Sequence, residues 1–135
     1  MATIKSDTTD IPQSPKQVFD FVADLNNLES LMPKEVEEWK SDVDSCEFTL
    51  KGMARLGMTI KERNETSLVQ LENTDVSPFP FTLNCNIEST DDDNTSKVNM
   101  VLDAELNPML SMLATKPLTN FLNILIENYK KQCTA

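Results

Sequence analysis

The sequence predicts an α+β fold, with one antiparallel sheet, two short helices near the N-terminus and a long C-terminal helix. Three observations support this prediction. A capped amphipathic helix follows a polar, strand-like N-terminus, a long middle region alternates apolar and polar residues, and an apolar stripe at helical spacing fills the C-terminal region. Because this order of elements runs through the whole chain, we expect a single domain over residues 1–135.

The N-terminal elements are predicted to be one polar strand and two short helices. Residues 3–11 are rich in Thr and Ser, so a strand there needs partners. Ser14 is a good N-cap, a proline fits the first helical position after it, and Gln17 completes a capping box. Asp24 ends this helix and caps a second short turn, which Pro33 ends.

The middle of the chain, from Val36 to Glu105, has a hydrophobic period of two. The apolar members of its runs are Cys46, Phe48 and Leu50; Ala54, Leu56, Met58 and Ile60; Val69 and Leu71; Phe81, Leu83, Cys85 and Ile87; and Val98, Met100, Leu102 and Ala104. Each run predicts a strand with one apolar and one polar face. Short polar clusters between the runs favour a meander of about six antiparallel strands.

The C-terminal region predicts one long helix. Asn107 can cap it and Pro108 can occupy its first position. Its apolar stripe consists of Leu110, Leu113, Ala114, Leu118, Phe121, Leu122, Leu125, Ile126 and Tyr129. A helix over residues 108–132 would be about 37 Å long. Pro117 lies inside it, and we expect a kink or a division of the helix after Ala114.

The motif I-P-x-S-P-x-x-V-F-x-F-V-A-D-x-x-N at residues 11–27, together with the order of elements, resembles the START-like (SRPBCC) superfamily. This superfamily includes birch-pollen allergens, lipid-transfer domains and polyketide cyclases. The resemblance implies a helix-grip fold, in which a curved antiparallel sheet of about six to seven strands wraps around the long C-terminal helix. It also implies a hydrophobic cavity between the sheet and that helix.

The charge balance disfavours several classes of partner. The chain has 22 acidic and 12 basic side chains, a net charge of −10, which disfavours nucleic acid and anionic membranes. No apolar run approaches about 18 residues, so we expect no stable membrane insertion. The N-terminus lacks an apolar signal-peptide core and the three cysteines are widely spaced, so a reduced cytoplasmic protein is expected. The composition leaves a homodimer open.

The chain contains no histidine. This excludes Ser-His-Asp and Cys-His nucleophilic pairs as well as histidine-based zinc sites. The cysteines match no common zinc spacing, and no motif indicates a cofactor or a metal. An enzyme would have to use carboxylates, lysines, Tyr129 or the cysteines, so the sequence favours binding over catalysis.

Two further features have two interpretations each. Met58 and Met100 lie on predicted inward faces, and Met109 and Met112 open the terminal helix. Flexible thioethers suit an adaptable pocket, and they suit an ordinary core equally well. Residues 78–81, Pro-Phe-Pro-Phe, fit an aromatic rim at a cavity mouth or a rigid start to a strand, and we favour the second.

The first functional hypothesis is a small binding or carrier protein for an apolar or amphipathic molecule, such as a lipid, held between sheet and helix. The predicted lining is Phe48, Leu56, Met58, Ile60, Leu83, Cys85, Met100, Leu102, Leu113, Pro117 and Phe121. One alternative is a cyclase or dehydratase that uses the same cavity and needs two convergent polar groups there. The other is an interaction or regulatory domain, with a filled core and an exposed apolar patch.

Overall fold

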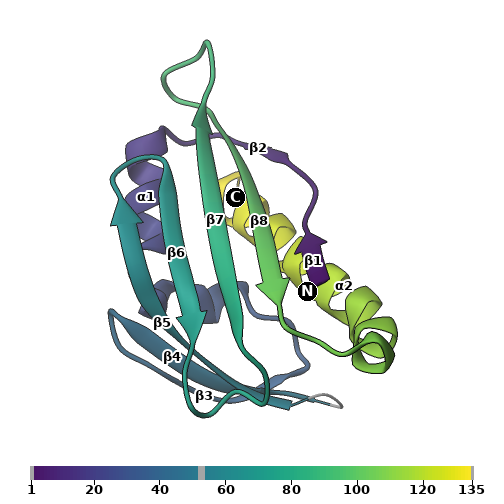
Figure 1. Ribbon diagram of the computed structural model, residues 1–135. Coiled ribbons are helices and arrows are strands. Elements are labelled where there is room, and N and C mark those ends of the chain that lie inside the picture. Colours follow the sequence, from purple (N-terminus) through teal and green to yellow (C-terminus); the bar gives the residue numbers. More distant parts are fainter. Residues whose placement is uncertain (1, 52–53, 135) are drawn as a thin grey trace.

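The computed structural model describes residues 2–51 and 54–134, and it has an α+β architecture (Figure 1). The helices are α1 (Pro15–Val22), the 3-10 helix η1 (Leu25–Leu31) and α2 (Pro108–Thr134). The strands are β1 (Ala2–Lys5), β2 (Thr9–Ile11), β3 (Val36–Ser41), β4 (Ser45–Leu50), β5 (Ala54–Asn64), β6 (Leu68–Asn73), β7 (Phe81–Ser89) and β8 (Ser96–Ala104). The sheet curves around α2, which crosses its concave face (Figure 1). The α+β class predicted from the sequence is confirmed.

The sheet is antiparallel throughout the described residues, in the order β1-β8-β7-β6-β5-β4-β3, and β2 also pairs with β8. It has eight strands rather than six or seven, because the single strand predicted over residues 3–11 is two strands. Ser6 separates them and remains tied to β8. Its N–H donates to the Met100 carbonyl at 2.9 Å, and its hydroxyl accepts from the Met100 N–H at 2.8 Å.

The predicted N-terminal caps are confirmed. The Gln17 N–H donates to the Ser14 hydroxyl at 3.2 Å, and the Ser14 N–H donates to Gln17 Oε1 at 2.9 Å. Asp24 accepts from the Asn26 N–H at 3.0 Å and starts η1. The buried face of α1, which includes Val18 and Val22, packs against β6 and β7. These two helices therefore cover one end of the sheet.

A loop between β6 and β7 folds back on β5 at Gly57. The Gly57 N–H donates to the Ser77 hydroxyl, which in turn donates to the Gly57 carbonyl, both at 2.9 Å. A Cβ at Gly57 would collide with the Thr74 hydroxyl, so the close approach requires glycine. The same loop buries Phe79 beside Phe81. The Pro-Phe-Pro-Phe segment is therefore part of the core packing next to the start of β7.

The helix α2 is continuous through Pro117, so the predicted division after Ala114 is wrong. Asn107 caps it as predicted, accepting from the Leu110 N–H at 2.8 Å. The later part of the predicted stripe is buried, namely Leu118, Phe121, Leu122, Leu125, Ile126 and Tyr129. The first turns extend past the edge of the sheet at β1 (Figure 1), and Leu113 is 70 % exposed instead of buried.

By length and composition alone, α2 is apolar enough to cross a membrane. The core helix of a globular domain passes the same test. Here the apolar character of α2 has two parts. Its later turns fill the concave face of the sheet, whereas Met109, Met112 and Leu113 are exposed on its first turns. The exposed part is therefore the feature that needs a functional explanation.

Candidate functional site

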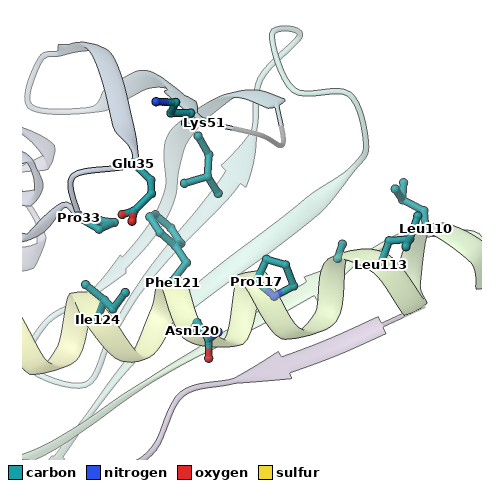
Figure 2. Close-up of a pocket in the computed structure, with 11 residues that line it drawn as sticks. Pro33, Glu35, Lys51, Leu110, Leu113, Pro117, Asn120, Phe121 and Ile124 are labelled. Carbon is teal, nitrogen blue, oxygen red and sulfur yellow. The ribbon is translucent and has the colours of Figure 1, made fainter.

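An open groove of about 570 Å³ runs along the first half of α2 (Figure 2). One wall is α2 itself, and the opposite wall comes from the segment after η1 and from the end of β4. Its lining consists of Pro33, Glu35, Leu50, Lys51, Leu110, Leu113, Ala114, Pro117, Asn120, Phe121 and Ile124. Eight of these eleven side chains are apolar, so the groove suits an apolar body.

Three polar side chains line the groove among the described residues, namely Glu35, Lys51 and Asn120. Glu35 and Lys51 extend from the wall opposite α2 (Figure 2). The Lys51 N–H donates to the Glu35 carbonyl at 2.8 Å, which continues the β3–β4 pairing and places the two residues on neighbouring segments of this wall. This wall therefore carries one negative and one positive charge, whose fields largely cancel at a distance.

Phe121 forms the inner end of the groove. Its side chain is 7 % exposed, and its ring stacks with Phe48 at a centroid distance of 5.9 Å. Phe48 stacks in turn with Trp39 at 5.5 Å. This aromatic row connects the groove to strands β4 and β3 and separates the groove from the interior.

Behind Phe121 the interior is nearly filled. The space between sheet and helix is a void of about 20 Å³, room for about one water molecule and no more. It is lined by Phe48, Leu56, Met58, Phe79, Phe81, Leu83, Leu102, Leu118, Phe121 and Leu122. The deep cavity that the family resemblance implied is therefore closed in this structure, and the open space lies at the outer end of the grip.

The eleven residues predicted to line a cavity fall into three groups. Leu113, Pro117 and Phe121 line the groove. Phe48, Leu56, Met58, Leu83 and Leu102 surround the small void with Phe121. Cys85 and Met100 are buried in the core, and Ile60 is half-buried against it.

The groove residues that were not predicted had only a partial signal in the sequence. Leu50, Leu110 and Ala114 belong to the apolar patterns, and Pro33 ends the second helix, but no pattern distinguished them from core residues. The remaining four had no signal, because their place in the groove depends on how α2 meets β3 and β4. These four are Glu35, Lys51, Asn120 and Ile124.

The titratable groups with the largest pKa shifts, Cys46, Cys85 and Tyr129, are buried in the core and do not line the groove. Burial raises the pKa of the Cys46 and Cys85 thiols to about 12. Burial also raises the pKa of Tyr129 well above its ordinary value. The Tyr129 hydroxyl donates to Gln13 Oε1 at 2.6 Å, and its ring stacks on Phe21 at 4.6 Å. These groups remain protonated near neutral pH and face protein partners instead of the groove.

The described part of the chain contains two buried polar residues, Ser6 and Ser96. Ser96 donates from its hydroxyl to the Gln13 carbonyl at 2.7 Å, and Ser6 joins β1 to β8 as described above. Within residues 2–51 and 54–134, no group of three Cys, Asp or Glu side chains is arranged to hold a metal ion. The groove is therefore the site with the strongest claim to function.

No protein-family model matches this chain, and no curated protein matches it by sequence. Solved structures do match it over nearly their whole length. The protein XoxI from Bacillus cereus is 14 % identical, with 99 % of this chain and 96 % of that chain covered and a TM-score of 0.78. A protein from Thermus thermophilus is 16 % identical, with 98 % and 97 % covered and a TM-score of 0.74. A START superfamily protein from Mycobacterium smegmatis is 12 % identical, with 98 % and 97 % covered and a TM-score of 0.72. The chain therefore has the helix-grip fold of the START superfamily.

Proposed function

We propose that this protein binds and carries an apolar or amphipathic small molecule, such as a lipid, in the groove along α2. One observation supports the proposal above the others. An apolar groove of about 570 Å³, lined in part by the exposed Leu113, lies in a domain whose described interior holds a void of only about 20 Å³. Its volume falls within the range of about 300–1,000 Å³ that is typical of small-molecule sites.

Burial of apolar surface would supply most of the affinity. A ligand that buries about 200 Å² of apolar area would gain about 5 kcal/mol from this effect. Part of that gain offsets the loss of ligand motion on binding. Burying Leu110 and Leu113, which are 39 % and 70 % exposed, would add to it on the protein side.

The neutral fluorescent probe N-phenyl-1-naphthylamine tests the proposal, because its emission rises in apolar surroundings. The Leu113→Asp variant places a carboxylate in the groove without touching the core, and we expect it to weaken probe binding at least tenfold, by about 1.4 kcal/mol or more. Val43→Asp is the matched control, because Val43 is 49 % exposed and lies outside the groove lining. Equal binding by the two variants would contradict the proposal.

Native mass spectrometry of the freshly purified protein, followed by organic extraction, addresses the natural ligand. We expect a reproducible apolar molecule in stoichiometric amount with the unmodified chain. We expect less of it with Leu113→Asp and an unchanged amount with Val43→Asp. A molecule retained equally by both variants would be bound somewhere other than the groove.

An interaction domain is the second candidate function, and two observations favour it. The core behind Phe121 is nearly filled, and Met109 and Met112 are 74 % and 85 % exposed. Such a domain would use these side chains to contact an apolar segment of a partner. Met112→Asp distinguishes the two functions, since Met112 does not line the groove and its substitution should leave the binding of the small probe intact.

A further inference from the structure

The interior proline of α2 gives the groove a polar feature that its side chains do not reveal. In an α-helix each carbonyl accepts from the N–H four residues later. Pro117 has no N–H, so it cannot donate to the Leu113 carbonyl. Leu113 and Pro117 both line the groove, and both side chains extend from α2 on the groove side (Figure 2). The carbonyl between them therefore lies at the groove wall.

The Leu113 carbonyl differs from two neighbouring carbonyls of α2 in its hydrogen bonding. Ala114, the next residue, is buried against the core, but Leu113 is 70 % exposed and Pro117 is exposed, so a ligand can approach α2 on the side of these two residues. The carbonyls of Ser111 and Thr115 each accept a hydroxyl from the threonine four residues later, at 2.6 Å from Thr115 and 2.7 Å from Thr119. The groove wall of α2 therefore presents this backbone acceptor, together with the side-chain amide of Asn120, within a mostly apolar surface.

We propose that the ligand is an uncharged amphiphile with a hydroxyl or phenol end, which donates a hydrogen bond to the Leu113 carbonyl. This inference rests on the proposed function and specifies its ligand class. The facing wall carries both Glu35 and Lys51, so a charged end would be attracted to one and repelled by the other. The net charge of −10 further disfavours an anionic ligand. An uncharged donor has no such conflict.

The test compares 1-decanol with its methyl ether, 1-methoxydecane, which has the same chain but no donor. Both compete with N-phenyl-1-naphthylamine, and the quantity measured is the ratio of their affinities. Pro117→Ala restores the N–H and closes the Leu113 carbonyl. It removes a proline from a helix interior, so the variant is expected to fold. We expect the affinity ratio of alcohol to ether to fall about two- to tenfold in the variant.

Two further variants separate the hydrogen bond from changes in groove shape. Pro117→Leu also restores the N–H but keeps an apolar side chain, so it should lower the ratio as Pro117→Ala does. Ile124→Ala removes apolar lining and leaves the carbonyl free, so it should weaken both compounds with an unchanged ratio. A ratio that is the same in the natural chain and in both Pro117 variants would overturn the inference.

The outcomes also distinguish this inference from the proposed function. If the fluorescent probe does not bind the natural chain, the proposed function fails. If the probe binds, but the affinity ratio of decanol to its ether is the same in the natural chain and in the Pro117 variants, the function stands and the ligand class is wrong. Decanoate that competes more strongly than decanol would likewise refute an uncharged ligand.

Discussion

Replacing Phe121 by alanine should lower stability and improve binding at once. The ring forms the inner end of the groove and also borders the small internal void. Removing a buried Phe side chain costs about 3–5 kcal/mol. We expect the lower end, about 3 kcal/mol, because one side of the Phe121 cavity opens to the groove. For 135 residues the entropy of unfolding is about 0.28 kcal/mol/K, so Tm should fall by about 10 °C.

The same substitution should join the groove to the void and lengthen the apolar site. Binding of N-phenyl-1-naphthylamine should therefore become tighter, measured by fluorescence titration well below the Tm of the variant, with Tm taken from circular dichroism. Leu125→Ala is the matched control, because Leu125 is 2 % exposed on the same helix and lines neither space. It should lose comparable stability without any gain in binding.

Weaker probe binding by Phe121→Ala would refute this reasoning, since it would mean that the ring is a contact surface and not a partition. An equal gain in Leu125→Ala would refute it as well, because loosening of the whole domain would then explain the result. Phe121→Leu provides a folded intermediate, for which about half of both effects is expected.

Three further predictions concern stability. Gly57→Ala should cost about 1–3 kcal/mol in urea denaturation, because the added Cβ collides with the β6–β7 loop, whereas an unchanged midpoint would mean that the loop moves freely. Ser14→Ala should cost about 1 kcal/mol through loss of the helix cap, and Ser14→Asp should retain most of it. Between about pH 9 and pH 12 the unfolded chain releases the protons of the Cys46 and Cys85 thiols while the native chain keeps them, so the free energy of unfolding should fall as pH rises. A Cys46→Ala/Cys85→Ala variant should show a smaller fall over this same range, from about pH 9 upwards, and an identical fall in both proteins would contradict the assigned cause.

The local elements were predictable because their signals are local. The capping box at Ser14 depends on residues three positions apart, and strand alternation depends on residues two positions apart. The division of the first strand at Ser6 was not predictable, because it depends on a pairing with Met100 almost a hundred residues away.

The groove was predicted in part, for a similar reason. Helical periodicity placed Leu110 and Leu113 in one apolar stripe with Leu118, but only Leu118 is buried, whereas Leu110 and Leu113 line the open groove. Periodicity carries no information on where the sheet ends, however, so it could not show that the first turns of α2 extend beyond it. Glu35 and Lys51 reach the groove only through the β3–β4 pairing, which the sequence does not specify at that detail.

Pro117 illustrates how a correct principle led to a wrong expectation. Proline removes one hydrogen bond from a helix, and this cost was expected to kink or divide α2 after Ala114; the division is the part that was wrong. The buried residues that follow, from Leu118 to Tyr129, anchor the helix on the sheet, and Asn107 caps its start. Tertiary packing therefore keeps α2 continuous despite the missing bond.

The aromatic row from the groove to β3 has a practical consequence. Trp39 is the only tryptophan in the chain, and its indole N–H donates to the Ser41 hydroxyl at 2.9 Å. Through Phe48, it is two ring contacts away from Phe121. A molecule that shifts the Phe121 ring would change the surroundings of this one indole, so the intrinsic ultraviolet emission of the unlabelled protein provides a sensor of whether the groove is occupied.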